Sequence, residues 1–218
     1  MLLQLSTTHH PATDLGYLLA KNPARVQSFD LSFGHAHVFY PVANENECTA
    51  ALLLDVDPVA LVRGKAQNEG LLAQYVNDRP YAATSFLSVA IAQVLRSALG
   101  GESRDRPELA ATPIPLRAQL ESVPGSPEQL DRLFAPLGYA IVAEAVGARH
   151  CRLTLSATTR LSDLLSHLYV LIPVLDDAKH YFVAEDEVDK LLRRGQGWLE
   201  LHPQRDWIVA RYLKKQSA

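Results

Sequence analysis

The stretch RLSDLLSHLYVLIPVLDD, residues 160–177, combines a long apolar run with helical spacing. Its leucines recur at intervals of three or four, which places them on one face of a helix; they are Leu161, Leu164, Leu165, Leu168 and Leu171. Pro173 is expected to kink or end this helix, because proline removes a backbone donor. A helix with such a face must pack on a core, which the rest of the chain has to supply.

Strands that could form this core are predicted in the first 60 residues. The segments MLLQLSTT (1–8) and CTAALLLDVDP (48–58) each predict a strand, the second one buried. SFDLSFGHAHVFYPV (28–42) alternates around Gly34, which indicates either two strands or one bulged strand. Helices are predicted within residues 11–26 and 68–99.

A second group of elements follows a change in composition. GESRDRPELAATPIP (101–115) contains three prolines and many charges, so we interpret it as a linker. After it come a strand, a helix with Ser126 as N-cap and a hairpin, in a compact β-α-β-β pattern. Helices are again predicted after residue 160, including EDEVDKLLRRG (185–195) and a last one with Pro203 at its first position.

The sequence therefore predicts an α+β fold with a mixed sheet and several helices. Residues 1–100 and 161–218 would form the main body, and residues 110–158 a small inserted β-α-β-β module packed beside it. A segment of about 45 residues is small to be stable alone, so we treat it as an insertion.

Composition indicates a soluble cytoplasmic protein without a membrane span. The chain has 218 residues and a net charge of -3, so it lacks the global basic field of non-specific nucleic-acid binders. Cys48 and Cys151 form no Cys-x-x-Cys motif and fit buried thiols in a reducing compartment. The N-terminal MLLQLSTTHH is not expected to be a signal peptide, and LYVLIPVL (168–175) is far short of the ~20 residues of a membrane span.

Two short motifs could bind a metal ion. Asp55 and Asp57 end a strand in a D-x-D pattern and could hold a divalent cation, although an Asp-Pro turn at the strand end is the favoured explanation. His35 and His37 would share one face of a strand, as metal ligands or as the polar face of an edge strand. Neither motif comes with an identifiable further ligand.

Asp176 and His180 lie four residues apart and would share a helix face, with Asp177 and Lys179 beside them. They could form a metal or acid–base pair, or a hydrogen bond that fixes a helix end. The chain lacks G-x-x-x-x-G-K-S/T, G-x-G-x-x-G and G-x-S-x-G, so it signals neither a phosphate cradle nor a nucleophile elbow. On these residues alone, both interpretations of the Asp176–His180 pair stay open.

Three long stretches together carry a family resemblance: TTHHPATDLGYLLAKNPARVQSFDLSFGHAHVFYP (7–41), QYVNDRPYAATSFLSVAIAQV (74–94) and RLSDLLSHLYVLIPVLDDAKHYFVAEDEVDKLLRRGQGWL (160–199). They resemble the N-terminal half of the bacterial RNA 3′-terminal ribose 2′-O-methyltransferase of the RNA-repair operon. The match is weakest over 100–158, where the turn VGARHC (146–151) is shorter than the family leads us to expect.

The resemblance implies that methyltransferase chemistry belongs to the C-terminal half of such proteins. The N-terminal half would have no catalytic residue, no cofactor and no resident metal. It would bind a polynucleotide kinase–phosphatase–ligase and activate its RNA ligase. Contact with RNA could then occur through the complex. The alternative is a metal-dependent enzyme or an RNA-binding module that acts directly on RNA 3′ ends.

By the same resemblance, a polar cluster would fix the fold or face the partner; it comprises Arg79, Tyr81, Asp176, Asp177, Lys179, His180 and Tyr181. A guanidinium presents donors in a planar fork that suits carboxylates. We therefore expect Arg79 to bond the Asp176–Asp177 pair and so to join the two halves of the body.

Overall fold

A computed structural model of the chain describes residues 1–57, 83–175 and 185–213. Within these residues one antiparallel sheet has the order β2-β3-β4-β1-β5-β7-β6. Its strands are β1 (Leu2–Thr7), β2 (Gln27–Leu31), β3 (Gly34–Ala43), β4 (Cys48–Val56), β5 (Ile114–Pro124), β6 (Ala140–Gly147) and β7 (His150–Thr159). The α+β class is confirmed, and the sheet is antiparallel where the sequence predicts a mixed one.

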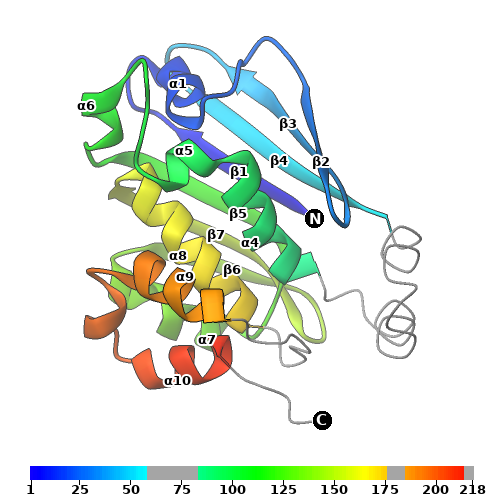
Figure 1. Ribbon diagram of the computed structural model, residues 1–218, viewed down its shortest axis with the longest axis vertical. Coiled ribbons are helices and arrows are strands. Elements are labelled where there is room, and N and C mark those ends of the chain that lie inside the picture. The colour runs from blue at the N-terminus through cyan, green and yellow to red at the C-terminus, as the bar shows by residue number, and fades with distance from the viewer. Residues whose placement is uncertain (58–82, 176–184, 214–218) are drawn as a thin grey trace.

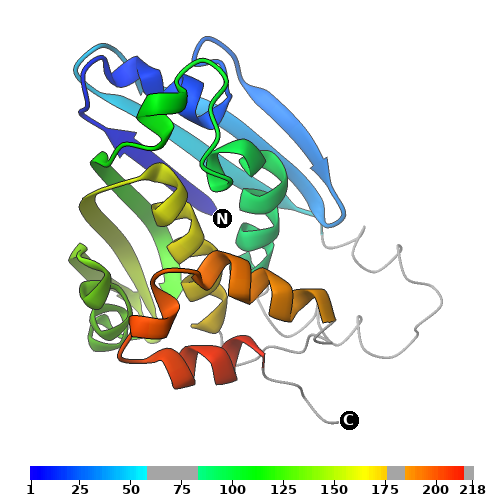
Figure 2. The ribbon, with the colours of Figure 1, turned by 60° about the vertical axis from the view of Figure 1, so that its left-hand side comes forward.

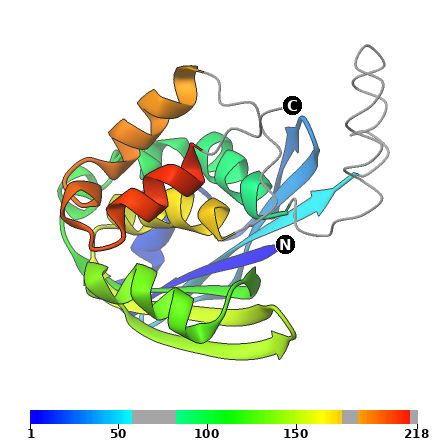
Figure 3. The same ribbon diagram turned by 90° about the horizontal axis from the view of Figure 1, so that it is seen from below.

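Helices pack on one face of this sheet (Figures 1 and 2). They are α1 (Leu15–Leu19), α4 (Ala83–Val94), α5 (Arg96–Leu99), α6 (Pro107–Ala110), α7 (Pro127–Phe134), α8 (Leu161–Val174), α9 (Glu185–Gly195) and α10 (Arg205–Tyr212), with 3-10 turns η1 (Ala12–Asp14), η3 (Ala135–Leu137) and η4 (Leu199–Leu201). Figure 3 shows α9 and α10 packed on α8, on its side away from the sheet. In the described parts of the chain, no helix is long and apolar enough to cross a membrane.

The N-terminal strand β1 lies in the middle of the sheet, between β4 and β5. Leu3 is paired with Leu52 on one side and with Leu120 on the other. All three side chains are buried, because strand residues that face each other across a ladder lie on the same face of a sheet. Strands from distant parts of the sequence thus present one apolar face.

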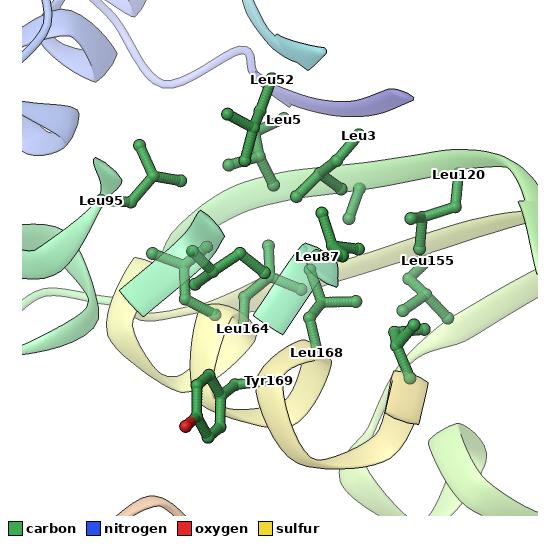
Figure 4. Packing of buried hydrophobic residues seen from close by; sticks show 14 of the residues in the cluster. Leu3, Leu5, Leu52, Leu87, Leu95, Leu120, Leu155, Leu164, Leu168 and Tyr169 are labelled. Carbon is green, nitrogen blue, oxygen red and sulfur yellow. The ribbon is translucent and has the colours of Figure 1, made fainter. Parts of the chain in front are cut away.

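Helix α8 covers this apolar face. Leu164 and Leu168 point toward the sheet leucines in Figure 4, and α4 packs beside α8 with Leu87 in the same cluster. The leucine spacing of residues 160–177 therefore predicts the central helix correctly. Both free cysteines are buried, as predicted.

Pro173 lies inside the last turn of α8 and does not end it early. A proline at this position cannot donate to the carbonyl of Tyr169, four residues earlier. The hydroxyl of Ser88 on α4 donates to that carbonyl instead, over 2.9 Å. The hydrogen bond lost to Pro173 is thus replaced by one that joins α8 to α4.

Gly34 is the first residue of β3, directly after the turn that follows β2, which decides between the two predictions for residues 28–42 in favour of two strands. Its φ is +139°, a backbone conformation that only glycine adopts without strain. A Cβ atom here would also overlap the backbone carbonyl of Asp55 on β4. Phe33, just before it, stacks on Phe86 of α4 with ring centroids 4.2 Å apart.

Residues 101–115, predicted to be a linker, are attached to the body of the molecule. Arg106 Nε donates to Asp14 Oδ2 over 3.0 Å, and its guanidinium lies 4.7 Å from the ring centroid of Tyr17. Ser103 Oγ donates to the Tyr17 carbonyl. Since Asp14 is buried, this ion pair fixes the segment to η1 and α1.

We expect Arg106→Ala to lower the melting temperature and to make the 101–113 segment a site of proteolysis. The replacement leaves a buried carboxylate without its cation. Limited proteolysis with mass spectrometry checks this, with Arg104→Ala, an exposed neighbour, as the control. Equal cleavage of both variants would show that the ion pair does not hold the segment.

The β-α-β-β pattern predicted for residues 110–158 is present as β5, α7, β6 and β7. These strands continue the same sheet, because β5 pairs with β1. The division into a body and a separate module stays a prediction, which expression of residues 110–158 alone can check. Ser126 caps α7 as predicted, accepting a hydrogen bond from the Gln129 amide.

Replacing Ser126 with alanine should lower the free energy of unfolding by about 1 kcal/mol, the usual effect of losing an N-cap. Ser126→Asp keeps an acceptor at the same position and should retain stability. Urea denaturation of both variants measures the difference. A similar loss in both would mean that the cap does not stabilise α7.

Candidate functional site

The polar cluster predicted from the sequence falls outside the described residues. This holds for all of its members: Arg79, Tyr81, Asp176, Asp177, Lys179, His180 and Tyr181. The predicted bond between Arg79 and the two aspartates therefore stays a prediction.

The H-x-H motif lies on β3, on the sheet face opposite the helices. His35 Nδ1 is 2.9 Å from Asp30 Oδ1, and His37 Nδ1 is 2.8 Å from Ser28 Oγ, so both rings bond to the neighbouring strand β2. Asp55, from the D-x-D motif, is the cross-strand partner of His35 on β4. Across the described residues, no three His, Cys, Asp or Glu side chains are placed to hold a metal. The arrangement fits a polar sheet face.

A cavity of about 350 Å³ opens near the start of α8, and sequence reasoning did not identify it. Its wall is formed by the η3 turn, the end of β7, the first turns of α8 and the segment that leads into α10. The lining residues are Pro136, Leu137, Thr159, Arg160, Asp163, His167, Gln196, Gly197, Trp198, Leu201 and His202.

His167 lies at the base of this cavity and is only 7% exposed. Its Nδ1 is 2.7 Å from the hydroxyl of buried Tyr139. Burial lowers the pKa of His167 to about 4 and raises that of Tyr139. The imidazole is therefore neutral and the phenol protonated at neutral pH. We assign the proton of the hydrogen bond to Tyr139, which leaves the His167 proton on Nε2.

His202 is also buried and has a fixed tautomer. Its Nδ1 accepts from the Gln204 amide over 3.0 Å, so its proton is on Nε2, which bonds to the Leu133 carbonyl over 2.9 Å. Trp198 lies between the two histidines, edge to face, with ring centroids 4.9 Å from His167 and 6.1 Å from His202. Trp198 Nε1 donates to the Arg194 carbonyl, so the aromatic wall is held rigidly.

An ion pair forms the polar side of the cavity. Arg160 donates from Nε and Nη2 to the two carboxylate oxygens of Asp163, over 2.8 and 2.9 Å. This bidentate geometry uses two of the roughly four acceptor positions of the carboxylate. The ion pair can therefore still accept hydrogen bonds from a ligand at Asp163.

Strand β6 forms an edge of the sheet and is another candidate contact surface. Its sequence, AIVAEAVG, has one charged residue, and Val142 and Val146 are 55% and 47% exposed. In the described chain nothing pairs with its outer edge. Natural edge strands usually carry lysine, proline or a covering element, so an apolar edge of this kind is suited to pairing with another strand.

In the comparison with protein families, residues 1–218 match the family described as "RNA repair, ligase-Pnkp-associating, region of Hen1". No curated protein matches the chain.

Two similar solved structures share the fold. A chain of the Pnkp1/Rnl/Hen1 RNA repair complex has a TM-score of 0.61 and 13% identity, over 89% of this chain and 47% of that one. A chain of a second Pnkp1/Rnl/Hen1 complex has a TM-score of 0.63 and 14% identity, over 98% of this chain and 52% of that one. The present chain thus spans about half the length of these relatives. Because the family model covers every residue, the chain belongs to the family of ligase-Pnkp-associating regions of Hen1.

Proposed function

We propose that this chain binds a bacterial polynucleotide kinase–phosphatase–ligase and raises its RNA-sealing activity, without a catalytic centre of its own. The observation that carries the proposal is the family match over all 218 residues, since the family is described by its association with the ligase Pnkp. The neighbouring solved structures are complexes with the same named components. We place this activity in the cytoplasm, and contact with RNA occurs through the complex.

Activation needs no chemistry from the activator. A protein that binds one conformation of its partner more tightly than another shifts the population toward the first. A preference of about 5.5 kcal/mol moves a two-state equilibrium from 1:99 to 99:1. A rigid sheet that pairs with a mobile segment of the ligase is able to supply such a preference.

The edge of β6 is the surface that we assign to this contact. Its outer backbone groups are available to an extended segment of the ligase, and Val142 and Val146 offer apolar contacts on alternate positions. The opposite edge, β2, carries Asp30 in a bond to His35. Each edge strand carries one charged residue, Asp30 on β2 and Glu144 on β6, so we choose β6 for its two exposed valines.

The test is a nick-sealing assay with purified ligase, with and without the 218-residue chain, together with measurement of the complex by calorimetry. We expect the chain to bind and to increase sealing. Val142→Glu should weaken both, and Val26→Glu, at a 70% exposed position preceding β2, should weaken neither.

The outcomes separate the parts of the proposal. Binding without any increase in sealing would overturn activation and leave association. Equal behaviour of Val142→Glu and Val26→Glu would remove β6 from the interface. Loss of binding in Arg79→Ala, with an unchanged melting temperature, would assign the contact to the polar cluster predicted from the sequence.

A further inference from the structure

The cavity at the start of α8 has no part in the proposed contact with the ligase. It contains two of the buried histidines of the molecule and a partly exposed tryptophan. Burying a polar group is unfavourable unless the group has a partner. Both nitrogens of His202 are bonded, and Nδ1 of His167 is bonded to Tyr139, so Nε2 of His167 is the histidine nitrogen that remains for a ligand.

The cavity offers one fixed donor and one acceptor. Tyr139 occupies Nδ1 of His167, so the group that His167 can offer to the cavity is Nε2–H. Asp163 keeps acceptor capacity beyond its two bonds from Arg160. Asp163 and His167 are four residues apart on α8 and so lie on the same helix face, about 5–6 Å apart at their Cβ atoms. A ligand that bonds to both His167 and Asp163 needs a hydrogen-bond acceptor and a donor on the same edge.

The aromatic side chain of Trp198 in the cavity wall favours a ligand with a flat ring. The Trp198 ring meets the rings of His167 and His202 edge to face, at 85° and 83°, and it is the partly exposed ring of the three. Stacking on aromatic side chains contributes about 1–3 kcal/mol per base in single-stranded nucleic-acid complexes. The cavity volume of about 350 Å³ lies at the small end of the range for ligand sites, which suits one ring system with its sugar.

Charge argues against an anion. Among the residues that line the cavity, Arg160 carries the positive charge, and its guanidinium is already bonded to the Asp163 carboxylate. A phosphate or carboxylate would meet the Asp163 carboxylate without a free cation to offset the repulsion. A wholly apolar ligand would leave the His167 donor unpaired, which is also unfavourable.

We propose that this cavity binds a single nucleobase, held by Asp163 and His167 along one edge and by Trp198 through its ring. Each base carries an acceptor next to a donor on its pairing edge, and none carries a charge. The base can come from a free nucleoside or from an unpaired nucleotide of RNA. This inference does not depend on activation of the ligase.

Isothermal titration of the 218-residue chain with adenosine, guanosine, cytidine and uridine tests the proposal. We expect saturable binding of at least one nucleoside. His167→Phe removes the donor and keeps a ring, and should weaken binding roughly tenfold, as expected for one hydrogen bond. Asp163→Ala should weaken it by a similar factor and is the safer variant, because this side chain is one-third exposed and leaves the core intact.

Asp30→Ala is the matched control, since Asp30 lies on β2 at the other edge of the sheet and should leave binding unchanged. A single-stranded hexaribonucleotide separates the sources of the base: tighter binding than the nucleoside indicates an RNA strand, and equal binding a free nucleoside. No saturable binding of any of these probes would overturn the proposal. So would binding that Asp163→Ala leaves unaltered, or tighter binding of inorganic phosphate or of a ligase peptide at the same cavity.

Discussion

Leu168→Ala is expected to lower the free energy of unfolding by about 2–5 kcal/mol, the range found for leucine truncation in well-packed cores. Leu168 is fully buried on α8 and packs among sheet and helix leucines (Figure 4). The replacement leaves a cavity at the centre of the only core cluster that we find in the described residues. Surrounding side chains come from several elements, so none can move alone to fill it.

Chemical denaturation measures this loss, and Leu192→Ala provides the control with the same chemical change. Leu192 lies on α9 and is 66% exposed, so its truncation should change the free energy of unfolding by less than about 0.5 kcal/mol. Similar losses in the two variants would mean that α8 is not the centre of the core.

Acidification should destabilise the protein through His167, by about 3 kcal/mol over the window from pH 6.5 to pH 4. Burial holds the pKa of the folded imidazole near 4, whereas the unfolded chain titrates near 6.5. Between these values the unfolded state binds a proton that the folded state does not. The contribution of His167 to stability is therefore complete above pH 6.5 and declines as the pH falls.

His167→Phe removes this titration. The variant should be less stable at neutral pH, because Tyr139 loses its acceptor, but its stability should fall less steeply in acid than that of the wild-type chain. Urea denaturation at several pH values compares the two slopes, and the other titrating groups contribute equally to both. Parallel slopes would show that His167 protonates in the folded state as readily as in the unfolded one.

Periodicity predicts most of the fold because it reports which face of each element is buried. The leucine spacing of α8 and the alternating burial of β5 follow this rule. Periodicity predicts the ends of helices less accurately. Pro203 was expected to begin the last helix, which begins at Arg205. The attachment of residues 101–115 could not be predicted, because the bond of Arg106 to Asp14 joins residues 92 positions apart.

The candidate site was harder to predict for a related reason. His35 and His37 are two residues apart and so form a visible motif. Tyr139 and His202 lie just before β6 and α10, and they approach His167 and its neighbour Trp198 only in the folded chain. One local signal existed: His167 is a titratable residue in an otherwise apolar helix segment. Its partner hydroxyl on Tyr139, 28 residues earlier, gives no pattern in the sequence.

The central position of β1 has a consequence during synthesis on the ribosome. Leu3 pairs with Leu120, so the first strand to emerge waits for a partner made more than a hundred residues later. At bacterial elongation rates of about 5–20 residues per second, that interval is on the order of ten seconds. Throughout it, the nascent chain carries an apolar strand with an unsatisfied edge. This protein is therefore expected to be a client of ribosome-associated chaperones, and its yield to depend on them more than its final stability suggests.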